Sequence, residues 1–208
     1  MNMNKKKLKI AITGNIGSGK SVFTDFIKKN NYPVINADEL SKSLLEKNLS
    51  VKKEVIKLFG NRAYINDKPD RRYIADIVFN DHFKLTMLES ILHPVVIKKS
   101  VELMDASLVT KDRVFVEAAL IYEADMEKYF DFVVLIVADK KLRLERKRKS
   151  EKFTEEEFEK REAMQIPEEE KRKRADFIFE NNSDLKDLKQ KAELLIILLN
   201  QPVTSNSH

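Results

Sequence analysis

The sequence predicts an α/β fold, in which a five-stranded parallel sheet is flanked by helices. Five short segments rich in Val, Ile and Phe alternate with longer charged segments that favour helices. Such near-continuous apolar segments are typical of parallel strands, because helices cover both faces of a parallel sheet. The expected strands span residues 8–13, 32–37, 113–118, 132–138 and 176–180.

The composition indicates a globular protein and narrows its chemistry. Hydrophobic residues make up 42% and charged residues 35% of the 208 positions, which is enough apolar material for a substantial core. Cysteine is absent, so disulfides and thiolate zinc sites are excluded. The apolar runs are too short for a signal peptide or for the roughly 20 residues of a membrane helix, so we expect a cytoplasmic protein without membrane association. The net charge of +5 favours anionic partners such as nucleotides.

Helices are predicted next to the first and the last strand. The first expected helix carries an apolar stripe formed by Val22, Phe23, Phe26 and Ile27. The last one follows a start signal at residues 182–184 and keeps apolar residues at three- and four-residue spacing. We expect this last helix to pack on the sheet, and residues 201–208 to form a flexible tail.

Two intervals between strands are too long to be simple connections. Residues 39–111 have a mostly helical pattern and predict an inserted helical domain for the substrate, whereas the highly charged residues 140–174 predict a lid. Within the lid, Thr154 and Glu157 match the S/T-x-x-E capping box, so a helix is expected to begin there. The nucleotide-binding core would then comprise residues 1–38, 112–139 and 175–200.

The segment IAITGNIGSGKSVF predicts a phosphate-binding loop. Residues 14–21 satisfy G-x-x-x-x-G-K-[ST] between an expected strand and an expected helix, which is the context that this motif requires. Three of the four glycines of the chain lie here, and they let backbone N–H groups approach phosphate oxygens. Lys20 would reach the β- and γ-phosphates, and the Ser21 hydroxyl would bind Mg²⁺. The complete motif disfavours the alternative of a glycine-rich turn without a ligand.

Other classes of nucleotide-binding protein fit the chain less well. A Ras-like GTPase needs D-x-x-G and N-K-x-D elements, and the sequence has neither. Motor and nucleic-acid ATPases usually need a larger body and an acidic strand end, for which the third expected strand offers only Glu117. A small-molecule kinase is the economical interpretation. For Glu117 the sequence leaves two roles open, a carboxylate that supports Mg²⁺ or a solvated strand end.

Asp38 follows the second expected strand in VINADEL. Ligands of open parallel sheets bind at the carboxyl ends of the strands, so this position places a carboxylate beside the phosphate-binding loop. A kinase needs such a group next to the acceptor hydroxyl. Asp38 could equally cap the helix that follows it, and its position alone leaves both roles open.

Residues 8–199 resemble the dephospho-CoA kinase family. The resemblance rests on segments that occur in this order: TGNIGSGKS, VINADEL, DRRYIADIVF, LESILHPVV, ALIYE, AMQIPEEEK and ADFIFEN. The loop alone is shared by many proteins, whereas the later segments together are quite specific to this family.

The resemblance implies the P-loop kinase fold with a helical CoA-binding insertion and a lid. It also implies phosphorylation of the ribose 3′-hydroxyl of dephospho-CoA, with ATP and Mg²⁺, to give coenzyme A and ADP. Two alternatives stay open: another nucleoside or nucleotide kinase of this fold, and a nucleotide-switched RNA-associated protein whose basic lid contacts RNA. We expect small-molecule substrates, no specific nucleic acid, and a monomer or weak homo-oligomer.

Roles of single residues follow from the same resemblance. Asp38 matches the second Asp of the family's D-A-D element and would act as the general base or orient the 3′-hydroxyl. Arg71 and His93 of the His-Pro element would bind the acceptor, and His93 would not act in catalysis. Asn181 would hold the adenine. The residues expected to bind ATP are Asn15, Gly17, Ser18, Gly19, Lys20, Ser21, Val22, Arg146 and Asn181.

The lid departs from the family's pattern. Arg146 matches the family's first lid arginine, whereas Ser150 stands where the second arginine is expected to face the phosphates. Arg148, Lys149 or Lys152 could replace that second arginine. Because lysine does not reproduce the forked geometry of arginine, Arg148 is the preferred catalytic substitute.

Four smaller departures lie elsewhere. Asn36 replaces the first Asp of D-A-D, which leaves Asp38 as the sole candidate carboxylate in that element. Asn15 replaces a glycine of the loop, and asparagine tolerates positive φ better than most residues. Val22 replaces a threonine near the α-phosphate, and Ala119 replaces a proline.

Overall fold

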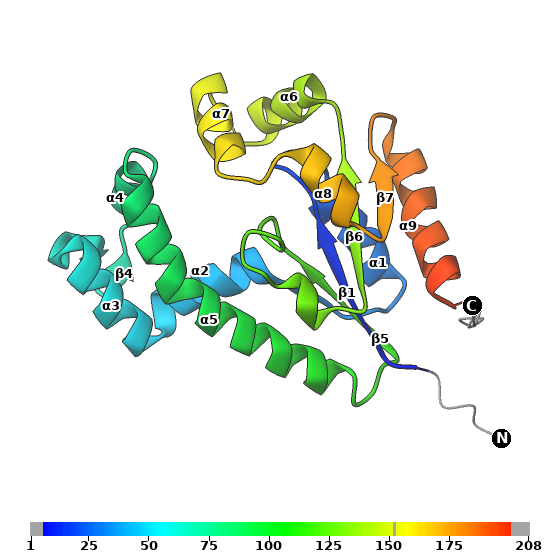
Figure 1. The fold of residues 1–208 in the computed structure, drawn as a ribbon, viewed down its shortest axis with the longest axis horizontal. Helices are drawn as coiled ribbons and strands as arrows, with labels where there is room; N and C mark the ends of the chain where they lie inside the picture. The colour runs from blue at the N-terminus through cyan, green and yellow to red at the C-terminus, as the bar shows by residue number, and fades with distance from the viewer. Residues whose placement is uncertain (1–5, 152, 201–208) are drawn as a thin grey trace.

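The computed structural model describes residues 6–151 and 153–200 (Figure 1). Its main sheet has the strand order β2-β5-β1-β6-β7, and every neighbouring pair is parallel, which confirms the predicted five-stranded parallel sheet. The carboxyl ends of all five strands therefore meet at one edge. The strands are β1 (Leu8–Thr13), β2 (Val34–Asn36), β5 (Arg113–Glu117), β6 (Phe132–Val137) and β7 (Phe177–Glu180).

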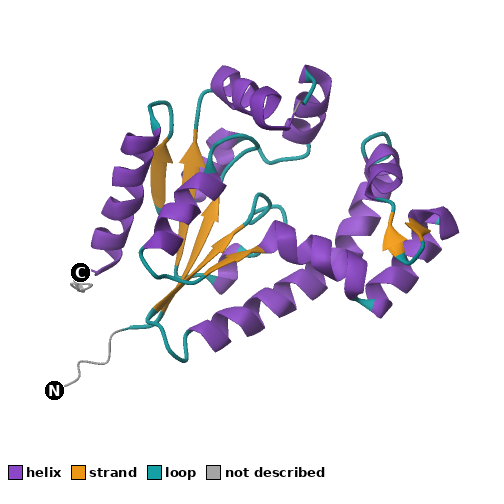
Figure 2. Cartoon of the chain, turned by 180° about the vertical axis from the view of Figure 1, so that it is seen from behind, coloured by secondary structure: helices purple, strands orange, loops and turns teal. Residues whose placement is uncertain are grey.

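Helices cover both faces of this sheet (Figure 2). On one face α1 (Lys20–Lys29) and α9 (Leu185–Asn200) bury Phe23, Ile27 and Leu188 against the strands. On the other face the second half of α5 (His82–Ser107) buries Val96 and Met104. Two-sided burial explains why the strands are almost continuously apolar. The predicted tail at residues 201–208 lies outside the described residues.

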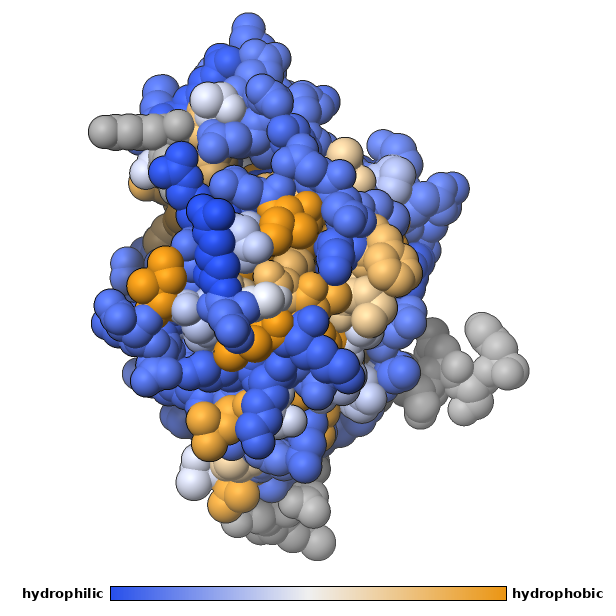
Figure 3. All heavy atoms as spheres, turned by 90° about the vertical axis from the view of Figure 1, so that its left-hand side faces the viewer, coloured by the Kyte–Doolittle hydropathy of each residue, from blue (hydrophilic) through white to orange (hydrophobic). Residues whose placement is uncertain are grey.

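The first long interval folds mainly into helices with a core of their own. Its helices are α2 (Ala37–Lys47), α3 (Leu49–Phe59), α4 (Arg71–Val78) and the start of α5, with a short 3-10 turn η1 (Asn61–Ala63). Val55, Phe59, Ile74 and Leu88 belong to this separate core. Because α5 continues from this core onto the sheet, one helix joins both parts. Figure 3 shows this end of the molecule, with hydrophilic side chains around a central group of hydrophobic ones.

A small hairpin in this interval was not predicted. Strands β3 (Tyr64–Ile65) and β4 (Lys68–Pro69) pair antiparallel, and the turn between them places Asn66 and Asp67 at positive φ. Asn and Asp are favoured in such two-residue turns because they tolerate the left-handed conformation. The strands have only two residues each, so hydrophobic periodicity could not indicate them.

The second long interval forms α6 (Lys140–Glu151), α7 (Glu155–Ala163) and α8 (Glu168–Arg174). The predicted capping box is confirmed, because the Thr154 and Glu157 side chains each accept a hydrogen bond from the other residue's backbone N–H. Helices α6 and α7 lie beyond the carboxyl ends of the strands, whereas α8 contacts β6 (Figure 1). Between β5 and β6 lies the short 3-10 turn η2 (Glu127–Tyr129).

No helix within residues 6–151 and 153–200 is both long enough and apolar enough to cross a membrane.

Candidate active site

The phosphate-binding loop connects β1 to α1 and depends on its glycines. Gly17 and Gly19 have φ values of 78° and 98°, which side chains other than glycine rarely adopt. A Cβ atom on Gly17 would lie 2.6 Å from the Arg143 carbonyl oxygen, and one on Gly19 would lie 2.2 Å from Nδ2 of Asn181. The loop therefore requires glycine both for its backbone conformation and for the close approach of its neighbours.

Lys20 begins α1, and its side chain folds back over the loop. Its Nζ donates hydrogen bonds to the carbonyl oxygens of Gly14 at 2.8 Å and Asn15 at 3.4 Å. Burial lowers the pKa of Lys20 to about 8, and the nearby carboxylates of Asp38 and Glu117 partly oppose this shift. The loop thus holds one cation at its mouth, in a position suited to phosphate oxygens.

Glu117 ends β5 and is a buried acceptor, with only 2% of its surface exposed. It accepts hydrogen bonds from Oγ of Ser21 at 2.5 Å, from Oγ1 of Thr24 at 2.8 Å and from Nδ2 of Asn36 at 3.3 Å. The alternative of a solvated strand end was therefore wrong. Three donors hold this carboxylate against α1 and β2, which fixes its place beside the Ser21 hydroxyl.

Asn36 also decides which residue caps α2. Its Oδ1 accepts a hydrogen bond from the Glu39 backbone N–H at 2.9 Å, so the cap is Asn36 and not Asp38. Its Nδ2 donates to Glu117, whereas an ionised Asp at this position could only accept and would face a second carboxylate. These two bonds give a physical account of Asn36 in this chain.

Asp38 lies in the first turn of α2 and is free of the capping role. Its side chain lies at the wall of a cleft, where the Ala119 backbone N–H interacts with the carboxylate and favours its charged form. Partial desolvation raises the pKa of Asp38, and the neighbouring Lys20 opposes this shift. The raised pKa makes the Asp38 carboxylate better able to accept a proton.

The cleft has a volume of about 550 Å³ and brings several predicted residues together. The phosphate-binding loop, α2, the end of β5 and the lid all contribute to its walls. The predicted site residues that line it are Gly17, Lys20, Ser21 and Asp38, and Glu117 lines it as well.

The cations of residues 140–174 that line the cleft are not the one preferred from the sequence. Arg148 is exposed and pairs with Glu155 at 2.8 Å, so this structure does not bring it to the cleft. Lys147 and Arg161 line the cleft instead. The Arg161 guanidinium lies 5.4 Å from the ring centre of Phe79, which caps the end of α4. Lys152, another candidate, lies outside the described residues.

Arg146 and Asn181 lie together behind the loop. Asn181 is buried and donates from Nδ2 to the Ser18 carbonyl oxygen at 2.7 Å. Nη2 of Arg146 donates to the Asn181 carbonyl oxygen at 2.8 Å, and burial lowers the pKa of Arg146. The predicted contact of both residues with ATP stays a prediction. Val22 is partly exposed on α1 and does not line the cleft.

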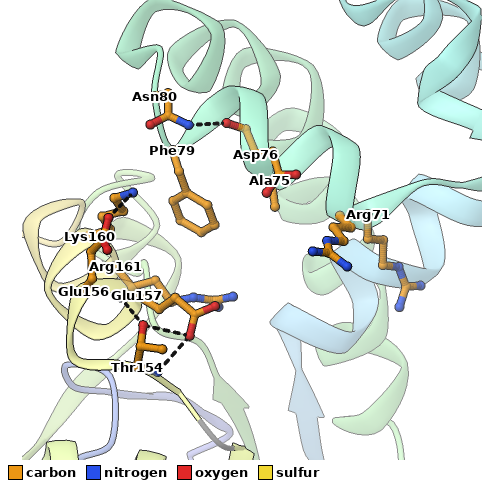
Figure 4. A pocket seen from close by; sticks show the side chains of 11 residues that line it. Arg71, Ala75, Asp76, Phe79, Asn80, Thr154, Glu156, Glu157, Lys160 and Arg161 are labelled. Carbon is orange, nitrogen blue, oxygen red and sulfur yellow. Dashed lines mark hydrogen bonds and ion pairs between the residues drawn. The ribbon is translucent and has the colours of Figure 1, made fainter.

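A second pocket, of about 710 Å³, lies between α4 and α7 (Figure 4). Phe79 and Arg161 line both this pocket and the cleft, so the two are adjacent. Figure 4 shows the Phe79 ring pointing toward α7. Arg71 is exposed in the wall of this pocket and donates to Oε2 of Glu46 at 3.3 Å. His93 is half-buried in α5 and lines neither pocket.

Comparison with known proteins agrees with this geometry. The family model described as dephospho-CoA kinase matches residues 8–187. The chain belongs to the dephospho-CoA kinase family. The Fusobacterium nucleatum dephospho-CoA kinase is 35% identical over 185 residues, which cover 88% of this chain and 94% of that protein.

Solved structures of similar proteins extend this comparison to the fold. A Thermus thermophilus protein has a TM-score of 0.79 at 33% identity, covering 95% of this chain and all of that chain. The dephospho-CoA kinase from Campylobacter jejuni has a TM-score of 0.67 at 30% identity, covering 91% of this chain and 95% of that chain. The predicted P-loop kinase fold is therefore confirmed for this member of the dephospho-CoA kinase family.

Lys147, Arg161 and Gln165 are among the cleft residues that sequence reasoning missed. The first two lie among many other cations in residues 140–174, and no local signal separates them from Arg148. Gln165 lies in the segment AMQIPEEEK, on which the resemblance partly rests, but nothing local indicates which atoms its side chain contacts.

Proposed function

We propose that this protein transfers the γ-phosphoryl group of ATP to the ribose 3′-hydroxyl of dephospho-CoA, giving coenzyme A and ADP. The observation that carries the proposal is a single cleft lined by both Lys20 of the phosphate-binding loop and Asp38 of α2. A donor site and an acceptor carboxylate in one cleft are what phosphoryl transfer requires. Membership of the dephospho-CoA kinase family supports this choice of acceptor.

Asp38 would act on the acceptor hydroxyl. As the 3′-oxygen forms its bond to the γ-phosphorus and the bond to ADP breaks, the hydroxyl proton passes to the Asp38 carboxylate. Its raised pKa favours this role, because a general base works best when its pKa lies nearer the operating pH. Lys20 would hold the β- and γ-phosphates of ATP in line with the attacking oxygen.

The residues beside the loop fit Mg²⁺. The Ser21 hydroxyl and the Glu117 carboxylate supply oxygen atoms, which Mg²⁺ prefers, and both line the cleft. Ser21 would bind the ion directly, and Glu117 would orient the Ser21 hydroxyl through their hydrogen bond. When bound, Mg²⁺ supplies charge neutralisation for the β- and γ-phosphates.

The second pocket is proposed as the site for the rest of the acceptor. Dephospho-CoA carries a diphosphate and a long amide-containing arm beyond its ribose, so it must extend past the cleft. This pocket adjoins the cleft and presents cations from two sides, with Arg71 and Arg72 on α4 and Lys160 and Arg161 on α7. Arginine and lysine at these positions favour a diphosphate. The ring of Phe79 offers an apolar surface between them (Figure 4).

The test is incubation with ATP and Mg²⁺ and, in separate reactions, dephospho-CoA, adenosine, AMP or pantetheine phosphate, followed by mass analysis. We expect an added phosphate on dephospho-CoA alone, and phosphorylation of adenosine or AMP instead would support a different nucleotide kinase. Asp38→Asn should lower kcat roughly 10²- to 10⁴-fold while ATP still binds. Asp25→Asn, an exposed carboxylate on α1, is the matched control. Full activity of Asp38→Asn would exclude its proposed role.

A further inference from the structure

Gln165 occupies a fixed position where the chain returns from the lid to the sheet. Its backbone N–H donates to the Glu162 carbonyl oxygen at 3.0 Å. The next residue, Ile166, donates its N–H to Oε1 of Glu123 at 2.8 Å. Glu123 in turn pairs with the wholly buried Lys171 at 2.8 Å. The backbone on which the Gln165 side chain stands is therefore tied to the body of the protein.

The two ends of the Gln165 amide contact two different loops. Oε1 accepts a hydrogen bond from the Ile16 backbone N–H, in the phosphate-binding loop, at 2.8 Å. Nε2 donates to the carbonyl oxygen of Ala119, in the loop after β5, at 3.2 Å. This pair of contacts needs an acceptor and a donor on one side chain. An apolar side chain of this length cannot make both contacts, and an ionised glutamate supplies no donor.

Each of these loops positions one half of the reaction. The loop containing Ile16 supplies the carbonyl oxygens that hold Nζ of Lys20. Ala119, in the other loop, lines the same cleft as Asp38, and its backbone N–H interacts with the Asp38 carboxylate. The Gln165 amide therefore connects the backbone that holds the donor-side cation to the backbone that holds the acceptor-side carboxylate.

The lid reinforces the donor side of this connection. Arg143 donates from Nη1 to the Ile16 carbonyl oxygen at 3.0 Å and pairs with Glu162 at 2.6 Å. Asn15 donates from Nδ2 to Oε1 of Glu162 at 3.3 Å. Both peptide groups of Ile16 are thus fixed by side chains from the base of the lid, with Gln165 on the N–H and Arg143 on the carbonyl.

We propose that Gln165 is a positioning residue that sets the distance between the phosphate-binding loop and Asp38, and so aligns ATP with the acceptor hydroxyl. The inference rests on the proposed function, since it assigns Asp38 to the acceptor. Its loss leaves both substrate sites intact but out of alignment. Misplacement of reacting groups by about 1 Å can cost about 10²-fold in rate. The effect therefore falls on kcat and not on ATP binding.

Two substitutions separate this role from simple packing. Gln165→Met keeps the length of the side chain and removes both polar ends. Gln165→Asn keeps the amide but shortens the side chain by one methylene group, so the amide cannot contact both loops. We expect both to lower kcat at saturating substrates on the order of 10- to 100-fold, with the Kd for ATP nearly unchanged in calorimetric titration. The ratio of ATP hydrolysed to dephospho-CoA phosphorylated should rise, because water competes for a misaligned phosphoryl group. Gln190→Met on α9, an exposed glutamine, is the matched control.

The outcomes decide the proposal. Wild-type kcat in Gln165→Met would show that only packing matters, and would overturn it. Equal fold losses of kcat and of ATP affinity would also overturn it. So would a fall in Tm large enough to explain the lost activity by unfolding, because a structural defect produces those results. If Gln165→Met does not fold, the comparison rests on Gln165→Asn with the same criteria. Absence of dephospho-CoA phosphorylation by the wild-type protein would instead count against the proposed function.

Discussion

The Ser21 hydroxyl donates a hydrogen bond of 2.5 Å to Glu117, which joins the first turn of α1 to the end of β5. Because β5 and β1 are neighbours in the sheet, the loop between β1 and α1 is fixed on both sides. Thr24, one turn along α1, donates to the second oxygen of the same carboxylate at 2.8 Å. Glu117 thereby sets the orientation of the one hydroxyl that we propose to bind Mg²⁺.

Glu117→Gln tests this relationship. Glutamine replaces one carboxylate oxygen, which accepts hydrogen bonds, with an NH₂ group, which donates them. At least one of the hydrogen bonds donated by Ser21, Thr24 and Asn36 must therefore be lost. We expect the Mg²⁺ concentration for half-maximal rate to rise roughly 10- to 100-fold, measured at fixed ATP. Asp25→Asn on the exposed side of α1 should change little. An unaltered Mg²⁺ dependence in Glu117→Gln would contradict the role.

A second prediction distinguishes the cations of the lid. Arg161 lines the cleft and Arg148 pairs with Glu155 outside it, so Arg161→Met should reduce kcat/KM and Arg148→Met should not. Loss of a hydrogen bond to a charged group costs about 1.5–3 kcal/mol, equivalent to roughly 10- to 100-fold. Steady-state kinetics with both substrates varied would measure the difference. Greater damage from Arg148→Met would show that the lid rearranges to bring Arg148 to the phosphates.

Much of the fold could be predicted because its signals are local. Five apolar segments indicated the five strands, and the Thr154 capping box indicated the start of α7. The hairpin of β3 and β4 could not be predicted, because two-residue strands carry no periodicity. The division into core, insertion and lid stays a prediction, since α5 packs on both the insertion and the sheet.

The site could be predicted only where one segment carries the chemistry. The phosphate-binding loop is one continuous motif, whereas the surroundings of Glu117 come from three elements and left its role open. Arg148 on α6 and Arg161 on α7 both lie in a highly charged segment, and nothing in that segment indicates that Arg161 lines the cleft. Gln165 contacts residues 149 and 46 positions away along the chain, and no single sequence reveals such contacts.

The lowered pKa of Lys20 predicts a pH dependence for ATP binding. Burial brings this pKa to about 8, so above that pH the free protein loses the cation that attracts phosphate. We expect kcat/KM for ATP to fall as pH rises through about 8, and kcat to fall only at higher pH, because bound phosphates favour the charged form. Profiles of both constants would measure this. If kcat and kcat/KM fell over the same pH range, the predicted role of Lys20 protonation in ATP binding would be contradicted.

The same group predicts how folding stability changes with pH. Unfolded Lys20 keeps its proton up to its ordinary pKa of 10.5, whereas the folded form releases it near 8. Between these values the unfolded state binds more protons, so the contribution of Lys20 to stability rises with pH. Lys20→Met removes that contribution, and urea unfolding of both proteins from pH 7 to 10.5 would show a flatter dependence for the variant.

Lys171 provides a test of folding stability. It is wholly buried on α8, with Nζ 2.8 Å from Oε1 of Glu123, so Lys171→Met leaves a buried carboxylate without its cation. We expect a loss of about 3–5 kcal/mol in the free energy of unfolding by urea. Adding Glu123→Gln should restore most of it, because the amide oxygen can still accept the Ile166 N–H without a charge. Lys189→Met breaks an exposed pair on α9 and should cost less than about 1 kcal/mol. Equal losses of unfolding free energy in Lys171→Met and Lys189→Met would show that the buried ion pair stabilises the fold no more than the exposed pair does.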